Sequence, residues 1–281
     1  MRNEPFEVRK IAGNIGAEIH GIDISQDLSD ETVAALRKAW LENLVLFFRE
    51  QDLPPARFLA FAKRFGETQE YPFVKGLPEF PEVITIAKME NEKVNFGGVW
   101  HSDTTYLERP PMASMLVARE VPPRGGDTMF ANGYLAYETL SDGLKKVLDG
   151  LVGISSSAKA DVSKTREDRI QTHGTDSGKA KETLIAKHKA VRTHPETGRK
   201  ALFVNTAHTT HFDGWTVQES KPLLDFIHEH QIRPEFTCRF RWREGSVAMW
   251  DNRCALHYPL NDYHGFKRVM HRITLAGDIP R

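Results

Sequence analysis

The chain has 281 residues, of which 40% are hydrophobic and 10% aromatic, so it can bury a sizeable core in one large or two small domains. Lys and Arg together number 38, as do Asp and Glu, and this balance argues against a nucleic-acid partner, because phosphate binding needs a basic surplus. Two cysteines, Cys238 and Cys254, are too few for a disulfide framework. The polar first ten residues and the lack of a membrane-spanning apolar stretch lead us to expect a cytoplasmic protein without a membrane partner.

The first third of the chain mixes predicted helices and strands. Residues 11–25 alternate apolar and polar residues around glycines, which predicts two short strands joined by a turn. A cap-like serine followed by two acidic residues predicts a helix over 29–43, and the apolar run 44–48 indicates a buried strand. A Pro-Pro pair predicts a second helix over 54–66, capped by its terminal glycine.

The rest of the chain is rich in strand-like runs. They lie at 83–87, 112–120, 127–132, 200–205, 236–242 and 246–252, and helices are expected over 132–148 and 220–231. The pattern favours a mostly β fold with helical additions, a jelly-roll barrel, and we see no linker that would divide a single domain over 1–281. Residues 155–187 are long, charged and poor in apolar residues, so they are either a lid over a site or a mobile surface insertion.

The stretch VWHSDTTY places His101 and Asp103 two residues apart. In an extended strand these side chains would point to the same face, where they could share a metal ion or a proton. Two histidines and one carboxylate make the facial triad of non-haem iron, and His257 in MWDNRCALHYPL is the candidate third ligand. It follows a strand-like run and closely precedes a proline, so we expect it at a strand end or at the rim of the barrel. Each motif alone is weak, because the chain has 12 histidines.

Arg268 lies eleven residues after His257 and strengthens the pattern, because arginine can bind a carboxylate through two hydrogen bonds. A redox cosubstrate with a carboxylate tail would chelate the metal at one end and bind the arginine at the other. Thr128, in RGGDT, could add a hydroxyl donor to the same carboxylate. An ordinary strand threonine after a Gly-Gly turn is the alternative.

Five motifs in this order, WHSD, PPRGGDTMFAN, VRTHPETGRKALFVN, MWDNRCALH and KRVMHR, resemble the taurine dioxygenase family, which also contains 2,4-dichlorophenoxyacetate and alkylsulfate dioxygenases. The resemblance covers nearly the whole chain. It implies an Fe(II)- and 2-oxoglutarate-dependent enzyme that uses O2, with a double-stranded β-helix (cupin-like jelly roll) core. Residue by residue, His101, Asp103 and His257 match the iron ligands, and Thr128 and Arg268 match the residues that hold the distal carboxylate of 2-oxoglutarate.

The substrate residues follow from the resemblance less directly. Arg272 matches an arginine near the cosubstrate and the substrate anion, which suggests a sulfonate, a sulfate ester or an aryloxyalkanoate; alternatively it only reinforces the 2-oxoglutarate site. Tyr71 and Val74 stand where the taurine enzymes carry a histidine and a tyrosine, which argues against taurine itself. His208 stands at a pocket-wall phenylalanine, and Tyr106 could line the pocket. An ordinary loop histidine and a core tyrosine are the alternatives.

The leading hypothesis is a dioxygenase that hydroxylates a small organic anion and converts 2-oxoglutarate to succinate and CO2, with no catalytic residue beyond the metal centre. One alternative is a biosynthetic hydroxylase or desaturase of an amino-acid-like molecule. A non-catalytic metal-binding jelly roll is another, although it would not need the carboxylate clamp. A zinc hydrolase also suits the ligand set. The family resemblance further implies a homodimer or homotetramer.

Overall fold

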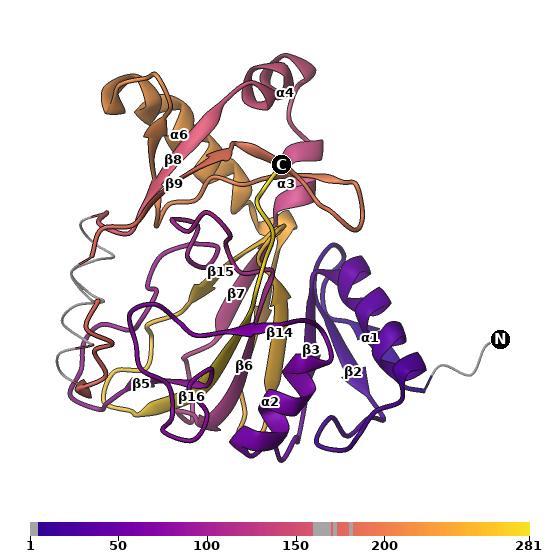
Figure 1. The fold of residues 1–281 in the computed structure, drawn as a ribbon. Helices are drawn as coiled ribbons and strands as arrows, with labels where there is room; N and C mark the ends of the chain where they lie inside the picture. Colours follow the sequence, from indigo (N-terminus) through magenta and orange to yellow (C-terminus); the bar gives the residue numbers. More distant parts are fainter. Residues whose placement is uncertain (1–4, 160–169, 171–172, 180–181) are drawn as a thin grey trace.

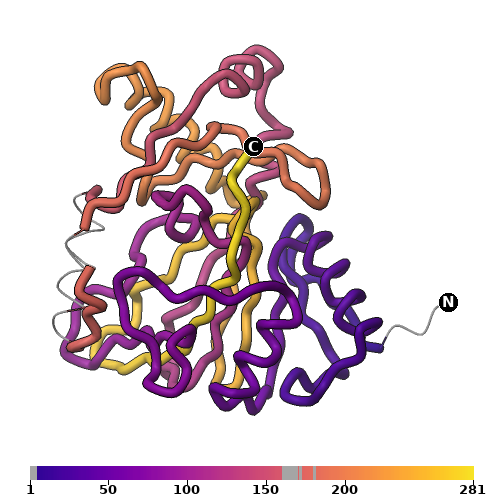
Figure 2. Tube along the Cα trace, in the orientation of Figure 1, coloured from indigo at the N-terminus to yellow at the C-terminus, as the bar shows by residue number. Residues whose placement is uncertain are grey.

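The computed structural model describes residues 5–159, 170, 173–179 and 182–281 (Figures 1 and 2). In this part the chain is mostly sheet with helices packed against it, and the main sheet has eight strands. Seven of them follow the order β1-β2-β3-β14-β6-β16-β4, and β5 also pairs with β16. They span Glu7–Lys10 (β1), Ala17–His20 (β2), Val45–Phe48 (β3), Thr68–Gln69 (β4), Ile84–Lys88 (β5), Ala113–Glu120 (β6), Val247–Asp251 (β14) and Arg268–Leu275 (β16).

A second sheet packs against the main one and encloses the central core. Its described strands follow the order β13-β7-β15 and span Thr237–Phe240, Thr128–Asn132 and Ala255–Pro259. Phe47 of β3 stacks on Phe240 and meets Phe130 edge-on, with ring centroids 4.0 and 5.6 Å apart. Its neighbours Leu46 and Phe48 belong to a second core on the opposite face. Because both faces of β3 are buried, its sequence is entirely apolar.

Two N-terminal helices cover that opposite face of the main sheet (Figure 1). Helix α1 spans Asp30–Asn43 and helix α2 spans Pro55–Lys63. The Ser29 side chain caps α1 by accepting a hydrogen bond from the Thr32 N–H. The apolar faces of both helices, including Trp40 and Phe58, are fully buried in the core beneath them.

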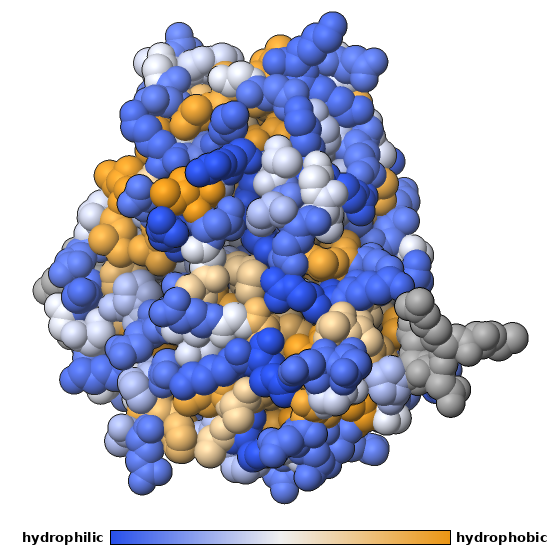
Figure 3. Space-filling model, turned by 45° about the vertical axis from the view of Figure 1, so that its right-hand side comes forward, coloured by the Kyte–Doolittle hydropathy of each residue, from blue (hydrophilic) through white to orange (hydrophobic). Residues whose placement is uncertain are grey.

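The remaining elements form a smaller layer, drawn above the two sheets in Figure 1. It contains a sheet in the order β12-β8-β9, the hairpin β10-β11 and three helices with a core of their own. The strands span Val152–Ser156 (β8), Ile185–Lys189 (β9), Val191–Thr193 (β10), Lys200–Leu202 (β11) and Thr209–Phe212 (β12), and the helices Gly133–Glu138 (α3), Asp142–Asp149 (α4) and Val217–Gln231 (α6), followed by a 3₁₀ turn at Pro234–Phe236. Hydrophilic side chains dominate the face in Figure 3, with apolar patches between them.

The structure confirms the predicted helix over 29–43 and the buried strand over 44–48 to within a residue. The strands predicted at 83–87, 112–120, 127–132, 236–242 and 246–252 are also present, shifted or shortened by one or two residues at their ends. The strand predicted over 200–205 ends at Leu202. The helix predicted near 220 begins earlier, at Val217, because Thr216 and Glu219 form a capping box.

Three predictions of local structure are wrong. Of the strand pair expected within 11–25, only β2 lies there, because β1 ends at Lys10. Helix α2 ends at Lys63 and is capped by Arg64 in a right-handed conformation, so Gly66 is not its cap. The single helix predicted over 132–148 is two helices, because the Ser141 side chain accepts a hydrogen bond from the Leu144 N–H and starts a new helix.

The segment predicted as a lid or insertion, 155–187, is shorter than expected, because β8 and β9 extend into its two ends. Residues 160–169, 171–172 and 180–181 lie outside the described residues. The described residues 173–179 run beside residues 72–75, where Val74 bridges Asp176 and the Lys75 N–H donates to the Thr175 carbonyl at 2.8 Å.

Two expectations from composition can be compared with the structure. Both cysteines are free and buried. None of the described helices is long and apolar enough to cross a membrane.

Candidate metal centre and binding pocket

His101, Asp103 and His257 converge in the interior of the protein. The ligand atoms of the three side chains lie within 4.8 Å of one another, and all three side chains are buried. The Nε2 atoms of His101 and His257 are 3.8 and 3.9 Å from the Asp103 Oδ1. Two imidazole nitrogens and one carboxylate oxygen around one point suit non-haem iron, and also a three-ligand zinc site. The structure therefore brings together the three residues that the sequence predicted as ligands.

The backbone that positions this group differs from the sequence prediction. His101 is not in a regular strand: it forms an isolated bridge with His257, with N···O distances of 3.0 and 2.8 Å. His257 lies in the middle of β15 rather than at a strand end. The chain turns immediately after Asp103, and Thr104 has a φ of 44°, which costs a β-branched residue about 1–3 kcal/mol. The shared direction of His101 and Asp103 therefore comes from a bridge followed by a strained turn.

Hydrogen bonds and burial set the protonation of the three side chains. The His101 Nδ1 lies 2.7 Å from the Val99 carbonyl oxygen, so Nδ1 carries the proton and Nε2 keeps its lone pair. Burial lowers the pKa of His101, and it lowers that of His257 well below the ordinary value. Burial opposes ionisation of Asp103, but Arg272, the two neighbouring histidines and the hydrogen bond from Ser114 together outweigh it and lower the pKa of the carboxyl. The group therefore consists of neutral imidazoles and an anionic carboxylate, the forms that bind metal.

A cavity with an empty volume of about 450 Å³ adjoins these ligand atoms. Arg268 of β16 and Thr128 of β7 both line it, as predicted for a carboxylate clamp. Arg268 is buried, and its Nε and Nη2 have no hydrogen-bond partner among the described residues. The Thr128 hydroxyl accepts a hydrogen bond from the Trp242 indole N–H at 2.9 Å, so its own proton is free to donate. A buried cation with open donors beside a free hydroxyl is suited to bind a carboxylate.

Arg272 lies two pleats along β16 from Arg268 and reaches the metal-ligand group itself. Its Nη1 is 3.4 Å from the Asp103 Oδ1, and its Nε and Nη2 have no hydrogen-bond partner among the described residues. Its guanidinium carbon is 4.6 Å from the centre of the Tyr71 ring. Arg272 therefore offers buried donors to a second anionic group near the ligand atoms.

The other predicted substrate residues form one wall beside this centre. The Tyr71 and Tyr106 hydroxyls are 3.5 Å apart, and the Tyr106 ring meets the His208 ring edge-on at 4.9 Å. The His208 ring in turn lies 6.3 Å from the His101 ring. Tyr71, Tyr106 and Val74 belong to one apolar cluster, which the described Ile170 of the 155–187 segment also joins.

A second hollow adjoins this wall and has an empty volume of about 690 Å³. Its lining is mostly apolar and includes Val74, Ile84 and Ile170. Ile86 and Phe96 line both this hollow and the cavity at Arg268, so the two spaces meet at these side chains.

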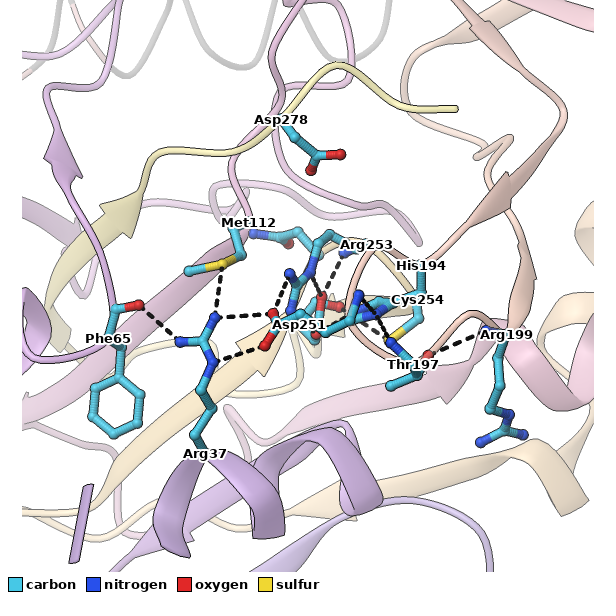
Figure 4. Close-up of polar contacts among 12 residues, drawn as sticks. Arg37, Phe65, Met112, His194, Thr197, Arg199, Asp251, Arg253, Cys254 and Asp278 are labelled. Carbon is cyan, nitrogen blue, oxygen red and sulfur yellow. Dashed lines mark hydrogen bonds and ion pairs between the residues drawn. The ribbon is translucent and has the colours of Figure 1, made fainter. Parts of the chain in front are cut away.

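His194, Asp251 and Cys254 form another buried group whose ligand atoms lie within 4.8 Å of one another, and the sequence reasoning missed it. The His194 Nδ1 accepts hydrogen bonds from two backbone N–H groups, so Nε2 carries the proton and donates to the Asp251 Oδ2 at 3.0 Å. The Arg253 guanidinium binds both oxygens of Asp251, at 2.8 and 2.7 Å (Figure 4). Burial raises the pKa of the Cys254 thiol well above its ordinary value. These side-chain atoms already have hydrogen-bond partners within the protein. His194, Asp251 and Arg253 therefore form a structural ionic cluster.

Comparisons with known proteins give a consistent result. A family model described as "Taurine catabolism dioxygenase TauD, TfdA family" matches residues 7–274. The chain is 35% identical to an alkylsulfatase of Acinetobacter baylyi, over 98% of this chain and 86% of the relative, and 34% identical to an alpha-ketoglutarate-dependent sulfate ester dioxygenase of Pseudomonas putida, over 98% and 91%. A taurine dioxygenase structure from Burkholderia xenovorans superposes with a TM-score of 0.83 at 37% identity, covering 98% and 92% of the two chains. The structure of AAD-2 with Mn(II) and N-oxalylglycine superposes with a TM-score of 0.77 at 26% identity, covering 98% of both.

Proposed function

The chain belongs to the taurine catabolism dioxygenase TauD, TfdA family, and we propose that it hydroxylates a small organic anion of the sulfonate, sulfate ester or aryloxyalkanoate class. It is an alpha-ketoglutarate-dependent dioxygenase, so Fe(II), 2-oxoglutarate and O2 are its cofactor and cosubstrates. The observation that carries the proposal is the buried His101, Asp103 and His257 group, which shares a cavity with the open donors of Arg268.

His101, Asp103 and His257 are the proposed ligands of Fe(II). When bound, iron supplies the reaction of O2 that converts 2-oxoglutarate to succinate and CO2 and hydroxylates the substrate. The neutral imidazoles and the anionic carboxylate need no proton loss before metal binding. The paired sheets β3-β14-β6-β16 and β13-β7-β15 support our proposal that the core is a double-stranded β-helix, with this group held between them.

Arg268 and Thr128 are the proposed clamp for the distal carboxylate of 2-oxoglutarate. The carboxylate would give the buried guanidinium the hydrogen-bond acceptor that the described residues do not provide. The Trp242 indole orients the Thr128 hydroxyl so that its proton is available to the same anion. A non-catalytic metal-binding protein would have no need of such a clamp.

Arg272, Tyr71, Tyr106 and His208 are the proposed substrate residues. Arg272 offers the anion its free donors, and the aromatic wall excludes water, which strengthens that attraction. The adjoining hollow at Ile86 and Phe96 is suited to the apolar part of the molecule. The relatives named for sulfate esters and 2,4-dichlorophenoxyacetate act on anions that have such a part. Tyr71 and Val74 remain our reason to expect little activity on taurine.

We also propose that Ile170 and residues 173–179, the described middle of the 155–187 segment, shield this wall. The support is that Ile170 packs into the cluster of Tyr71 and Tyr106 and that residues 173–179 run along residues 72–75. The single domain over 1–281, the homodimer or homotetramer and the cytoplasmic location remain predictions.

The test is succinate formation by protein loaded with Fe(II) without oxygen and then given 2-oxoglutarate and O2. A panel of sulfonates, sulfate esters, aryloxyalkanoates and amino acids would be compared. We expect one of the first three classes to stimulate succinate formation, and zinc-loaded protein to form none. Stimulation by amino acids alone would contradict the proposed substrate class. The absence of iron-dependent succinate under every condition would contradict the reaction itself.

A further inference from the structure

We propose that Trp250, Asn252 and Ser114 form a one-way chain of hydrogen bonds that fixes the Asp103 carboxylate, so that only its Oδ1 faces the metal position. This inference rests on the proposed function, because it assigns these three as positioning residues for a metal ligand. None of the three was predicted as a site residue from the sequence. All three side chains are at most 2% exposed.

The direction of the chain follows from its first member. The Trp250 indole N–H can only donate, and it lies 2.9 Å from the Asn252 Oδ1. The amide oxygen of Asn252 therefore accepts, and its Nδ2 donates to the Ser114 Oγ at 3.0 Å. The single hydroxyl proton of Ser114 is then left for the Asp103 Oδ2, at 2.5 Å. Each of these side chains therefore fixes the orientation of the side chain that follows it.

Because Ser114 holds the Oδ2 of Asp103, the other oxygen of this carboxylate is the one that faces the metal position. The other oxygen, Oδ1, faces the Nε2 atoms of His101 and His257. Arg272 approaches the same Oδ1, but at 3.4 Å, which is longer than a normal hydrogen bond. Without Ser114 the carboxylate could rotate and pair closely with Arg272. The hydrogen bonds from Trp250 to Ser114 therefore keep Oδ1 for the metal and leave Arg272 available to an anion.

Figure 4 shows the ionic cluster of His194, Asp251 and Arg253. This cluster holds the turn that contains Asn252. Asn252 lies between Asp251 and Arg253, and its backbone N–H donates to the Met112 carbonyl at 3.0 Å. Arg253 also binds Glu196 at 2.7 Å, and Glu196 binds Arg37 of α1 at the same distance. The turn is therefore anchored to α1 and to the segment after β10, which restricts movement of the Asn252 amide.

The test is the affinity of metal-free protein for Mn(II), measured by titration, in wild type and in Ser114→Ala. Outer hydrogen-bond partners of metal ligands are typically worth 10–100-fold in affinity, so we expect Mn(II) binding about 10-fold or more weaker. Asn252→Asp keeps the shape but cannot donate to Ser114, so it should weaken Mn(II) binding in the same way. Trp250→Phe should have the smallest effect, because it keeps an aromatic ring beside His257 and breaks only the first hydrogen bond of the series.

Ser220→Ala is the matched control. Ser220 is also fully buried, and its hydroxyl accepts a hydrogen bond from the Phe212 N–H at 3.0 Å, in the other layer of the protein. Both serine variants should lose some stability, but only Ser114→Ala should lose Mn(II) affinity. A folded Ser114→Ala protein with wild-type affinity would overturn the inference, and if that variant does not fold, wild-type affinity in folded Asn252→Asp would do the same. Failure of the proposed function would instead appear as wild-type protein that forms no succinate.

Discussion

Two buried groups in this protein each combine histidine and aspartate with a neighbouring arginine, yet they differ in their hydrogen bonding. In the cluster of His194, Asp251 and Arg253, each charged group meets a partner within the protein. At the metal-ligand group, Arg268 and Arg272 keep N–H groups that have no partner among the described residues. A buried polar group without a partner costs about 1–3 kcal/mol. The two groups therefore differ in whether their arginines keep open donors, a difference that residue types alone do not show.

The largest effect should follow Asp103→Ala, which removes one of the three proposed ligands. We expect iron-dependent succinate formation and metal affinity to fall by more than about 100-fold, beyond the usual range for outer partners. Metal titration and succinate assays would measure this, with Asp149→Ala on the surface as the control. Near-normal turnover would mean that the metal binds elsewhere. The two buried groups would then no longer differ as metal site and structural cluster.

Asp251→Ala tests whether the ionic cluster stabilises the fold. It leaves Arg253 and His194 buried without their acceptor, and breaking a buried ion pair typically costs about 3–5 kcal/mol. We expect that loss in the free energy of urea unfolding of metal-free protein. An unfolding midpoint equal to that of wild type would show that the ionic cluster does not hold its turn.

Arg268→Ala should act on the cosubstrate and not on the metal. A hydrogen bond to a charged group contributes about 1.5–3 kcal/mol, so the KM for 2-oxoglutarate should rise about 10- to 100-fold. Thr128→Val should raise it less, because a neutral donor contributes less. Mn(II) affinity should stay at the wild-type value in both variants. An unchanged KM in Arg268→Ala would assign the carboxylate clamp to Arg272.

The smallest expected effect is a change in the free energy of unfolding at acid pH. Burial would raise the pKa of Asp251, but Arg253 and His194 outweigh it and hold the pKa below the usual 3.8. A carboxyl with a lowered folded-state pKa stabilises the protein fully above its unfolded pKa and loses that contribution as pH falls below it. The stability gap between wild type and Asp251→Asn should therefore be constant from pH 7 to 5 and narrow below about pH 3.8. Urea midpoints of metal-free protein across this range would measure it, and a gap that widens in acid would contradict the sign.

The sequence predicted which three side chains converge better than it predicted the backbone that carries them. His101, Asp103 and His257 could be found because chemistry restricts ligand types and because the motifs occur in a family order. The strained turn at Thr104 could not be found, since a β-branched residue normally avoids a positive φ. Gly97 gives a partial sequence signal of the close packing around His101. A Cβ at this position would lie 2.8 Å from the His101 ring, so glycine is required.

The mostly β fold was predictable from alternating and apolar runs, but the strands β8, β9, β10 and β12 of the smaller layer were missed. Strands β9 and β10 lie in or next to charged sequence, where tertiary pairing outweighs local preference. The ionic cluster was missed for a similar reason. Asp251 and Arg253 are close in the sequence, but their partner His194 lies more than fifty residues earlier, and no local spacing links it to them. Asn252 and Trp250 lie within the quoted MWDN motif, but their hydrogen-bond partner Ser114 belongs to another strand.

The bridge between His101 and His257 has a consequence for biosynthesis. It joins a residue of the first half of the chain to one that the ribosome adds much later. A nascent chain that has not yet reached β15 carries at most two of the three ligands, so it cannot assemble the centre. The three proposed ligands therefore come together only after translation of β15.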